Sequence, residues 1–262
     1  RKECREFATH WVGVQSEEAM ATLEDAARAA GARYFGYGQS WSFQVENGRL
    51  IYQDEDRLCD LDAPRLAGAH QFDNAALAVA ALRAAGLAFT DEVLSRGVAS
   101  ARWPARLQPL QEGKLVALVR SGAPGADLWL DGGHNPHAAL ALAAAMADLE
   151  DRAPRPLVLI AGMQENKDAG GFFAAFAGLA DEVIAISSHH RAAASAEAIA
   201  AAARSAGLKA RVSSSLIEAA QAAGARGAPL RVLICGSLYL AGHVLALHSG
   251  EEPSKVSGAA RR

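Results

Sequence analysis

The alternation of short apolar runs with helical segments in the second half of the chain constrains its fold most strongly. Apolar runs of strand length recur there between segments with helical periodicity. Strands are expected at 128–130, 157–161, 183–187, near 211 and at 230–235, and helices at 136–149, 170–179, 195–206, 216–223 and 238–247. Such alternation is typical of a parallel sheet covered by helices on both faces. The sequence therefore predicts an α/β protein with a doubly wound, mostly parallel, Rossmann-like sheet.

The N-terminal part of the chain follows a different pattern, in which one hairpin is the clearest feature. Asn47-Gly48 lies between two apolar segments and predicts a tight turn, because both turn positions need positive φ. Ser16 and Gly31 are typical of the positions that begin and end a helix. Helices are expected at 16–30, 71–85 and 90–100, and strands at 33–37, 41–46 and 49–53. With few core strands, this part is not expected to be a complete α/β domain.

The change of pattern between Trp103 and Leu110 indicates a domain boundary. A strand is expected just after it, at residues 115–119. We therefore expect one part at residues 1–107 and a second domain, able to fold by itself, at residues 108–248. Residues 249–262 are small or charged and lack periodicity, so a disordered tail is expected there.

The composition argues against several classes of protein. The formal net charge is −3, so no basic field indicates binding of nucleic acid or of an anionic membrane. The longest apolar stretch, residues 232–247, is shorter than the about 20 residues that a membrane helix needs. Cys4, Cys59 and Cys235 lack CxxC spacing, which argues against a disulfide framework or structural zinc. The expected compartment is a reducing cytoplasm.

The segment Asp131-Gly132-Gly133-His134-Asn135-Pro136 is the most informative local feature. It follows the expected strand 128–130 and opens a helix at Pro136, where a missing N–H costs nothing. A carboxylate at the carboxyl end of a parallel strand lies where open α/β sheets bind ligands, and it can accept hydrogen bonds from ribose hydroxyls. His134 can donate to a phosphate. The alternative is a structural strand–turn–helix connection, with Asn135 as the N-cap.

Two other segments each offer one candidate side chain. In the segment from Gly68 to Ala76, Asn74 lies one helical turn after His70, and its carboxamide can read an adenine edge. The alternative there is a capping histidine with a surface amide. In Trp103-Pro104-Ala105-Arg106-Leu107-Gln108, the planar guanidinium of Arg106 can reach a phosphate from a hinge between domains. The alternative is an ordinary surface arginine.

These segments, in this order and together with Gly162 to Asp168 and Gly236 to Gly242, resemble a known family. The chain is similar to the bifunctional dihydrofolate synthase/folylpolyglutamate synthases of the Mur ligase superfamily over roughly residues 60 to 247. The family patterns are HQxxNAAxAxAAL, WPGRLQ, DGAHNP, GxxxxKD and GSLYLAGxVL. The departures from them are Ala105 for a glycine, Gly133 for an alanine and His243 for a glutamate.

The resemblance implies an ATP-dependent ligase of folate biosynthesis. ATP would phosphorylate a carboxylate of dihydropteroate or a reduced folate, and the amine of L-glutamate would attack the acyl phosphate. Carried over by position, Asn74 would contact adenine, Arg106 the phosphates and Asp131 the ribose. His134 is the catalytic candidate on the phosphate side. Lys167 and Ser237 are candidates for binding glutamate, although either could instead be a helix cap or a solvated surface group.

The phosphate loop expected of such a ligase is not found in the sequence. No GxxxxGK[ST] pattern occurs, and no metal ligands are assigned in this chain. The resemblance places the Mg²⁺ ligands and the folate-binding segment before the part represented here. Residues 1–107 would then be the C-terminal part of the central P-loop-type ATPase domain, and residues 108–248 the C-terminal Rossmann-like domain. A monomer is expected, with small-molecule substrates as its partners.

Three functions from different classes are consistent with the sequence alone. The first is the ligase. This chain would be a part of it and would be inactive by itself. The second is a non-catalytic module that binds adenine nucleotides. The third is a nicotinamide-dependent oxidoreductase, which only the doubly wound pattern suggests, because no GxGxxG follows an early strand. An in-frame GxxxxGK[ST] upstream of Arg1 would favour the first function over the second.

Overall fold

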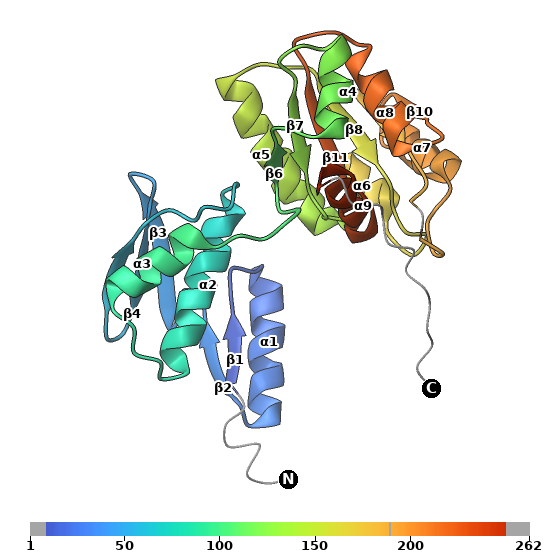
Figure 1. The fold of residues 1–262 in the computed structure, drawn as a ribbon. Coiled ribbons are helices and arrows are strands. Elements are labelled where there is room, and N and C mark those ends of the chain that lie inside the picture. Colours follow the sequence, from blue (N-terminus) through green and yellow to red (C-terminus); the bar gives the residue numbers. More distant parts are fainter. Residues whose placement is uncertain (1–8, 189, 250–262) are drawn as a thin grey trace, which may run out of the picture. The chain divides into compact units, whose positions relative to one another are not determined.

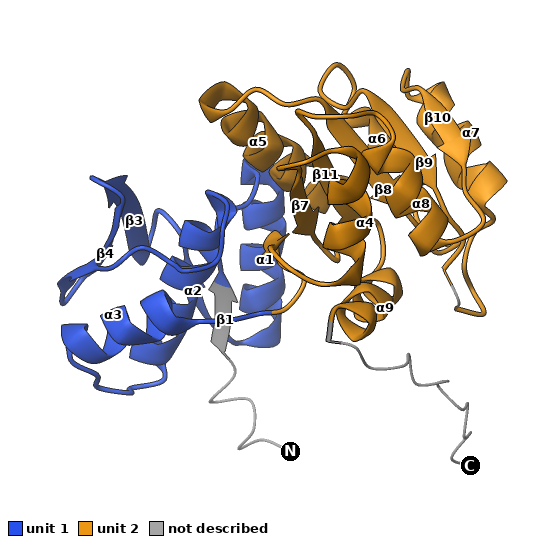
Figure 2. Cartoon of the chain, turned by 45° about the horizontal axis from the view of Figure 1, so that its top comes forward, with its two compact units in different colours: residues 1–103 blue, residues 104–262 orange. Residues whose placement is uncertain are grey.

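The computed structural model describes residues 9–188 and 190–249, and the chain divides between Trp103 and Pro104 into two units (Figure 1, Figure 2). Each unit is described by itself. The segment that carries Arg106 belongs to the second unit, whereas the sequence suggested a boundary after residue 107. The expected tail at 249–262 lies outside the described residues, apart from the last helical position, Ser249.

Among the described residues, the first unit combines two small sheets with three helices. Strands β1 and β2 pair in parallel, while β3, β4 and β5 form an antiparallel sheet. The elements are β1 (Thr9–Val12), α1 (Glu17–Ala30), β2 (Arg33–Gly36), β3 (Trp41–Glu46), β4 (Arg49–Asp54), β5 (Leu58–Leu61), α2 (His70–Ala84) and α3 (Asp91–Ser100). Strands β1 and β5, each four residues long, were not among the strands expected from the sequence.

The hairpin turn and the helix caps of this unit form where the sequence predicts them. Asn47 and Gly48 have φ of 51° and 76° and connect β3 to β4 in a tight hairpin. The hydroxyl of Ser16 accepts from the N–H of Ala19 at 3.3 Å, and Gly31 ends α1 in the left-handed conformation. The predicted hairpin and the predicted caps of α1 are therefore confirmed.

The first unit has its own apolar core between the antiparallel sheet and helices α2 and α3. Its buried side chains are Trp41, Leu50, Tyr52, Cys59, Leu61, Ala76, Val79, Ala80 and Leu94. Burial raises the pKa of Tyr52, whose hydroxyl donates to Asp54 at 3.1 Å. Asp54 also pairs with Arg83 of α2. This partly buried ion pair ties α2 to the end of β4.

The second unit is built on a six-stranded sheet with the order β10-β9-β8-β11-β7-β6. All neighbouring strands pair in parallel except β6, which is antiparallel to β7. The elements are β6 (Gln108–Leu110), α4 (Lys114–Gly122), β7 (Asp127–Leu130), α5 (Pro136–Arg152), β8 (Leu157–Ala161), α6 (Ala169–Ala174), β9 (Glu182–Ala185), α7 (Ala196–Ser205), β10 (Ala210–Val212), α8 (Leu216–Gly224), β11 (Arg231–Cys235) and α9 (Leu238–Ser249). The predicted α/β class and mostly parallel sheet are confirmed.

The strand expected at 115–119 is wrong, because this segment lies inside helix α4. Leu115, Val116 and Val119 are buried together on one helical face, which packs against α8. The two helices approach closely: a β-carbon at Gly122 would lie 2.6 Å from the carbonyl oxygen of Gly224. Strand β6, which the sequence did not indicate, occupies the edge of the sheet instead.

Helices cover both faces of this sheet. Helix α4 packs against α8 and α9, whereas α5 packs against α6 and α6 against α7. Alternate strand residues such as Leu128, Val158 and Val232 join the core with α4, α8 and α9. The helices after β7, β8 and β9 therefore belong to the α5–α7 layer, and the helices after β10 and β11 to the α8–α9 layer.

Candidate functional site

The carboxyl ends of β7, β11 and β8 meet at one edge of the sheet, because these strands are parallel neighbours. Asp131 follows β7, Ser237 follows β11 by two residues, and Gly162 follows β8. The chain leaves β11 toward α9 on one face, but leaves β7 and β8 toward α5 and α6 on the other. Connections that diverge in this way open the crevice in which α/β sheets bind ligands. We take this edge as the candidate site.

Asp131 is a buried carboxylate at the centre of this edge, with only 5% of its surface exposed. Its Oδ1 accepts from the N–H of Gly133 at 2.6 Å, and its Oδ2 accepts from the N–H of Leu107 at 2.7 Å. Its own N–H donates to the carbonyl of Ile234 at 2.9 Å. Asp131 thus joins three separate segments of the second unit.

The cap of helix α5 is Asn135 and not Asp131. Asn135 has extended backbone geometry, and its side-chain oxygen accepts from the N–H of Ala138 at 2.8 Å. Pro136 occupies the first helical position, as the sequence predicted. Since the helix start is already satisfied, the carboxylate of Asp131 has a different structural task.

Arg106 stands beside the glycine turn that follows β7. Its Nη1 lies 3.5 Å from where a β-carbon of Gly132 would be, and such a carbon would also collide with Leu238. A larger residue here would push aside the end of the exposed Leu238 side chain. Within residues 9–188 and 190–249, no carboxylate pairs with the guanidinium of Arg106. The turn is thus faced by a half-exposed cation without a counter-ion.

The residues on either side of Arg106 have an unusual backbone conformation. Ala105 has φ of 54° and Leu107 has φ of 41°, in the left-handed region. This region costs an L-residue about 1–2 kcal/mol. Ala105 stands where the family pattern has glycine, the residue that avoids this cost. Both residues are nevertheless buried, so the surrounding bonds and packing must hold the turn.

The imidazole of His134 contacts the same turn. Its Nδ1 lies 3.0 Å from the carbonyl oxygen of Gly132, so this nitrogen donates and carries a hydrogen. In the neutral ring the other nitrogen, Nε2, is then unprotonated and can only accept. His134 can therefore donate to a phosphate only in its cationic form.

Ser237 and Lys167 lie at the same edge, in the connections after β11 and β8. Ser237 is 3% exposed, and its Oγ accepts from the backbone N–H groups of Tyr239 and Leu240 at 3.2 and 3.4 Å. Its hydroxyl thus caps α9, which leaves its O–H hydrogen to donate. Lys167 is half-buried, and the next residue, Asp168, caps α6. The structure brings both candidates to the edge that carries Asp131.

A stacked aromatic pair at this edge was missed by the sequence reasoning. The rings of His190 and Tyr239 lie 3.7 Å apart between centroids and are inclined by 22°. His190 belongs to the connection after β9, and Tyr239 lies in the first turn of α9. Tyr239 was within a recognised motif, but no sequence signal marked His190.

Asn74 is the one predicted site residue in the first unit. It is exposed on α2, and its Nδ2 donates to the side-chain oxygen of Gln71 at 3.1 Å. The amide nitrogen of Gln71 lies 2.8 Å from Nε2 of His70. Asn74 and His70 are thus linked through a buried glutamine at the start of α2.

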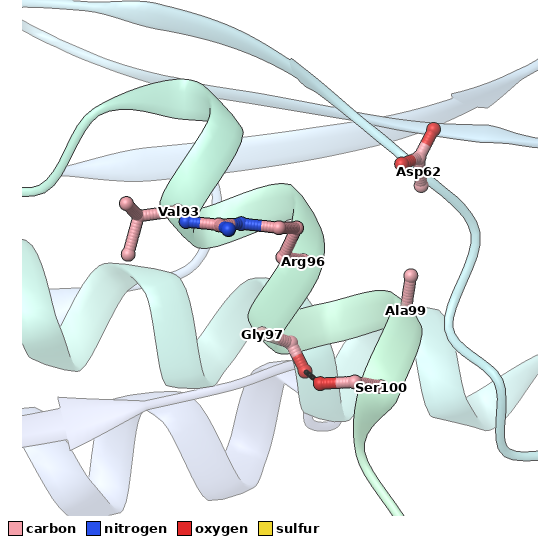
Figure 3. Close-up of a pocket in the computed structure, with 6 residues that line it drawn as sticks. All are labelled: Asp62, Val93, Arg96, Gly97, Ala99 and Ser100. Atoms are coloured by element: carbon pink, nitrogen blue, oxygen red, sulfur yellow. Dashed lines mark hydrogen bonds between the residues drawn. The ribbon is translucent and has the colours of Figure 1, made fainter.

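The first unit also has an open hollow of about 560 Å³ between α3 and the end of β5. Figure 3 shows its lining, which consists of Asp62, Val93, Arg96, Gly97, Ala99 and Ser100. Hydrogen bonds from Ser95 and Arg49 hold the pKa of Asp62 below its usual range. None of the predicted site residues lines this hollow.

Residues 9–188 and 190–249 contain no group of three or more His, Cys, Asp or Glu side chains placed to hold a metal ion. In the same residues, no helix is long and apolar enough to cross a membrane.

The second unit is similar to a known family of ligase domains. Residues 117–238 match the family model described as "Mur ligase, glutamate ligase domain". The dihydrofolate synthase/folylpolyglutamate synthase of Escherichia coli is 32% identical over 170 residues, which are 64% of this chain and 36% of that protein. The chain thus spans about a third of the length of this relative.

Solved structures are similar over both units. Escherichia coli FolC in complex with DHPP and ADP matches with a TM-score of 0.75 and 27% identity, over 93% of this chain and 54% of that chain. A bifunctional folylpolyglutamate synthase/dihydrofolate synthase with Mn, AMPPNP and L-glutamate bound matches with a TM-score of 0.69 and 27% identity, over 86% and 50% of the two chains. Residues 117–238 of this chain are therefore similar to the Mur ligase glutamate ligase domain, and most of the chain is similar to part of the dihydrofolate synthase/folylpolyglutamate synthases.

Proposed function

We propose that this chain is part of an ATP-dependent ligase that adds L-glutamate to dihydropteroate, to reduced folates, or to both. The observation that carries the proposal is the arrangement of Arg106 and Asp131 at the carboxyl edge of β7 and β11. An unpaired cation and a buried acceptor face one glycine turn there. The related structures with ADP, with AMPPNP and Mn, and with L-glutamate support a nucleotide and an amino acid as ligands.

The chemistry proceeds in two balanced steps. A substrate carboxylate attacks the terminal phosphorus of ATP, which gives an acyl phosphate and ADP. The glutamate amine then attacks the acyl carbon, phosphate leaves, and an amide forms with loss of a proton. Charge builds up on phosphate oxygens in the first step, where a bidentate guanidinium such as that of Arg106 stabilises it.

The donor set of this edge suits a nucleotide. The carboxylate of Asp131 accepts hydrogen bonds, as ribose hydroxyls require, and the guanidinium of Arg106 donates them, as phosphates require. In the first unit, taken by itself, the carboxamide of Asn74 both donates and accepts, as an adenine edge requires. A divalent metal bound with ATP would neutralise phosphate charge, and none of the residues assigned here is proposed as its ligand.

The glutamate side is assigned to Ser237 and Lys167, with His134 on the phosphate side. The ammonium of Lys167 can pair with a glutamate carboxylate, and the hydroxyl of Ser237 can donate to one while its oxygen caps α9. His134 in its cationic form can donate from Nε2 to the departing phosphate. All three follow carboxyl ends of neighbouring strands.

Nucleotide binding by the chain as given tests the proposal. The Kd for ADP is measured by calorimetry for the unaltered chain, for Arg106→Ala and for the matched control Arg152→Ala, whose side chain is exposed. We expect on the order of tenfold weaker binding for Arg106→Ala, the scale of a charge-assisted hydrogen bond, and no change for the control. Equal affinity in all three proteins would refute the assignment of Arg106.

Turnover separates a ligase from a non-catalytic binding module. The chain as given is expected to release no phosphate from ATP in the presence of magnesium, glutamate and dihydropteroate, because no phosphate loop occurs in its sequence. The product of the complete reading frame is assayed in parallel and is expected to turn over. If that product binds ADP but shows no substrate-dependent phosphate release, the binding module is the correct function.

A further inference from the structure

The turn that carries Arg106 is closed by a side chain. The amide oxygen of Gln108, the first residue of β6, accepts the N–H of Ala105 at 2.9 Å. Gln108 is itself fixed, because β6 pairs with β7 and sets Gln108 opposite Leu130. The bond therefore spans the turn from a sheet residue to the residue just before Arg106.

The other side of the turn is anchored to the segment after β7. The N–H of Leu107 donates to Asp131 at 2.7 Å, and the carbonyl of Ala105 accepts from the N–H of Gly132 at 3.0 Å. Both neighbours of Arg106 are thus held by bonds to the sheet. Both also have positive φ, a conformation that L-residues leave readily when nothing restrains them.

We propose that Gln108 is a positioning residue for Arg106. By accepting the Ala105 N–H, it keeps Ala105 in the left-handed conformation and so holds the Arg106 guanidinium over the glycine turn. Loss of this acceptor frees the turn to relax toward negative φ, which moves the base of the Arg106 side chain away from Gly132. Asp131 anchors the following residue, so two side chains fix the position of one cation.

The position of Arg106 is measured first without any ligand. The Nε–H resonance of Arg106, assigned through Arg106→Lys, is compared by NMR relaxation in the unaltered chain and in variants of Gln108. Gln108→Leu removes the acceptor, whereas Gln108→Glu keeps an acceptor oxygen at the same reach. We expect an ordered Arg106 side chain in the unaltered chain and in Gln108→Glu, and a mobile one in Gln108→Leu. Gln221→Leu, at an exposed helix position, is the control.

The consequence for binding rests on the proposed function, in which Arg106 contacts phosphates. The Kd for ADP is measured for Gln108→Leu, for Arg106→Ala and for the double variant. If Gln108 acts through Arg106, Gln108→Leu weakens binding by on the order of threefold to tenfold, and the double variant binds no worse than Arg106→Ala. Gln108→Glu restores affinity.

The two measurements separate the ways in which the inference fails. An Arg106 side chain that stays ordered in Gln108→Leu overturns the positioning role, as does a Gln108→Leu effect that persists in full without Arg106. A drop in melting temperature with an unchanged Arg106 resonance identifies a merely structural glutamine. If the resonance responds but ADP affinity depends on neither residue, the positioning role stands and the phosphate role of Arg106 is wrong.

Discussion

In the sheet of the second unit, charged side chains at the amino ends of the strands (the amino edge) have surroundings opposite to those at the carboxyl ends (the carboxyl edge). At the amino edge, Arg231 is only 2% exposed, donates to Glu150 at 3.2 Å and lies 3.6 Å from Asp127. It also donates to the carbonyls of Leu149 and Ala153. At the carboxyl edge, the described residues provide Arg106 with no carboxylate partner. Paired, buried charge identifies the edge that holds the fold together, and uncompensated charge identifies the edge that can hold an anion.

The amino edge is expected to show the largest effect on stability. Arg231→Met keeps most of the volume but removes one donor each from Glu150, Leu149 and Ala153. Glu150 keeps the N–H of Arg155, and the carbonyl of Leu149 keeps the N–H of Ala153. We expect the free energy of unfolding to fall by about 3 kcal/mol, at the lower end for a broken buried pair because the carboxylates are partly exposed. Denaturant titration measures this, with exposed Arg152→Met as the control. A loss below about 1 kcal/mol would contradict the comparison.

Asp131 is expected to have both a structural and a ligand-binding role, so Asp131→Asn should affect both stability and binding. Its carboxylate accepts from the N–H groups of Leu107 and Gly133, and an asparagine presents one oxygen and one NH₂ to them. We expect a loss of about 1–3 kcal/mol in the free energy of unfolding, together with weaker ADP binding. Denaturant titration and calorimetry on the same preparations measure both. Unchanged stability would show that the two backbone contacts carry little energy.

Arg106→Ala should have a smaller effect, and only on binding. Because the guanidinium has no described charge partner, its removal breaks no ion pair in the ligand-free protein. We expect the melting temperature to change by less than about 2 °C, which corresponds to the few tenths of a kcal/mol usual for surface substitutions. ADP affinity should fall by on the order of tenfold. A large drop in melting temperature would place Arg106 with the structural charges of the amino edge.

Ala105→Gly is expected to have the smallest effect, an increase in the free energy of unfolding. Glycine adopts the observed φ of 54° without the cost that a β-carbon incurs. The gain in the free energy of unfolding is about 1 kcal/mol, reduced by the greater freedom of glycine in the unfolded chain. Thermal unfolding detects it. A clear loss of stability would mean that packing of the buried Ala105 methyl outweighs the backbone term.

Local signals were enough for most elements. The Asn47-Gly48 hairpin, the caps of α1 and the start of α5 at Asn135-Pro136 depend on bonds between residues close in the chain. Segment 115–119 failed because five consecutive apolar residues fit a buried strand as well as a helix. Its helical state is decided by packing on α8 through Gly122 and Gly224, which is invisible to local pattern.

In the candidate site, too, local motifs predicted some features and only the tertiary structure revealed others. Asp131, Arg106, His134, Lys167 and Ser237 were selected by motif, and the structure sets all five at one edge of the sheet. Motifs did not reveal that β11 inserts between β7 and β8, or that His190 stacks on Tyr239. They also did not reveal that Asp131 holds the N–H of Leu107, 24 residues earlier. From the sequence, Ser237 could either bind glutamate or cap a helix, and its Oγ does cap α9.

The sequence by itself determined most of the strands and helices, many of the turns and caps that separate them, and the side-chain chemistry at the carboxyl ends of the strands. These depend on residues within a few positions of one another. Only the tertiary structure decided the strand order and the antiparallel edge strand β6. It also decided the hydrogen bonds by which Gln108 and Asp131 hold the two neighbours of Arg106. These features depend on hydrogen bonds between residues that become neighbours only once the sheet has formed, so no local pattern records them.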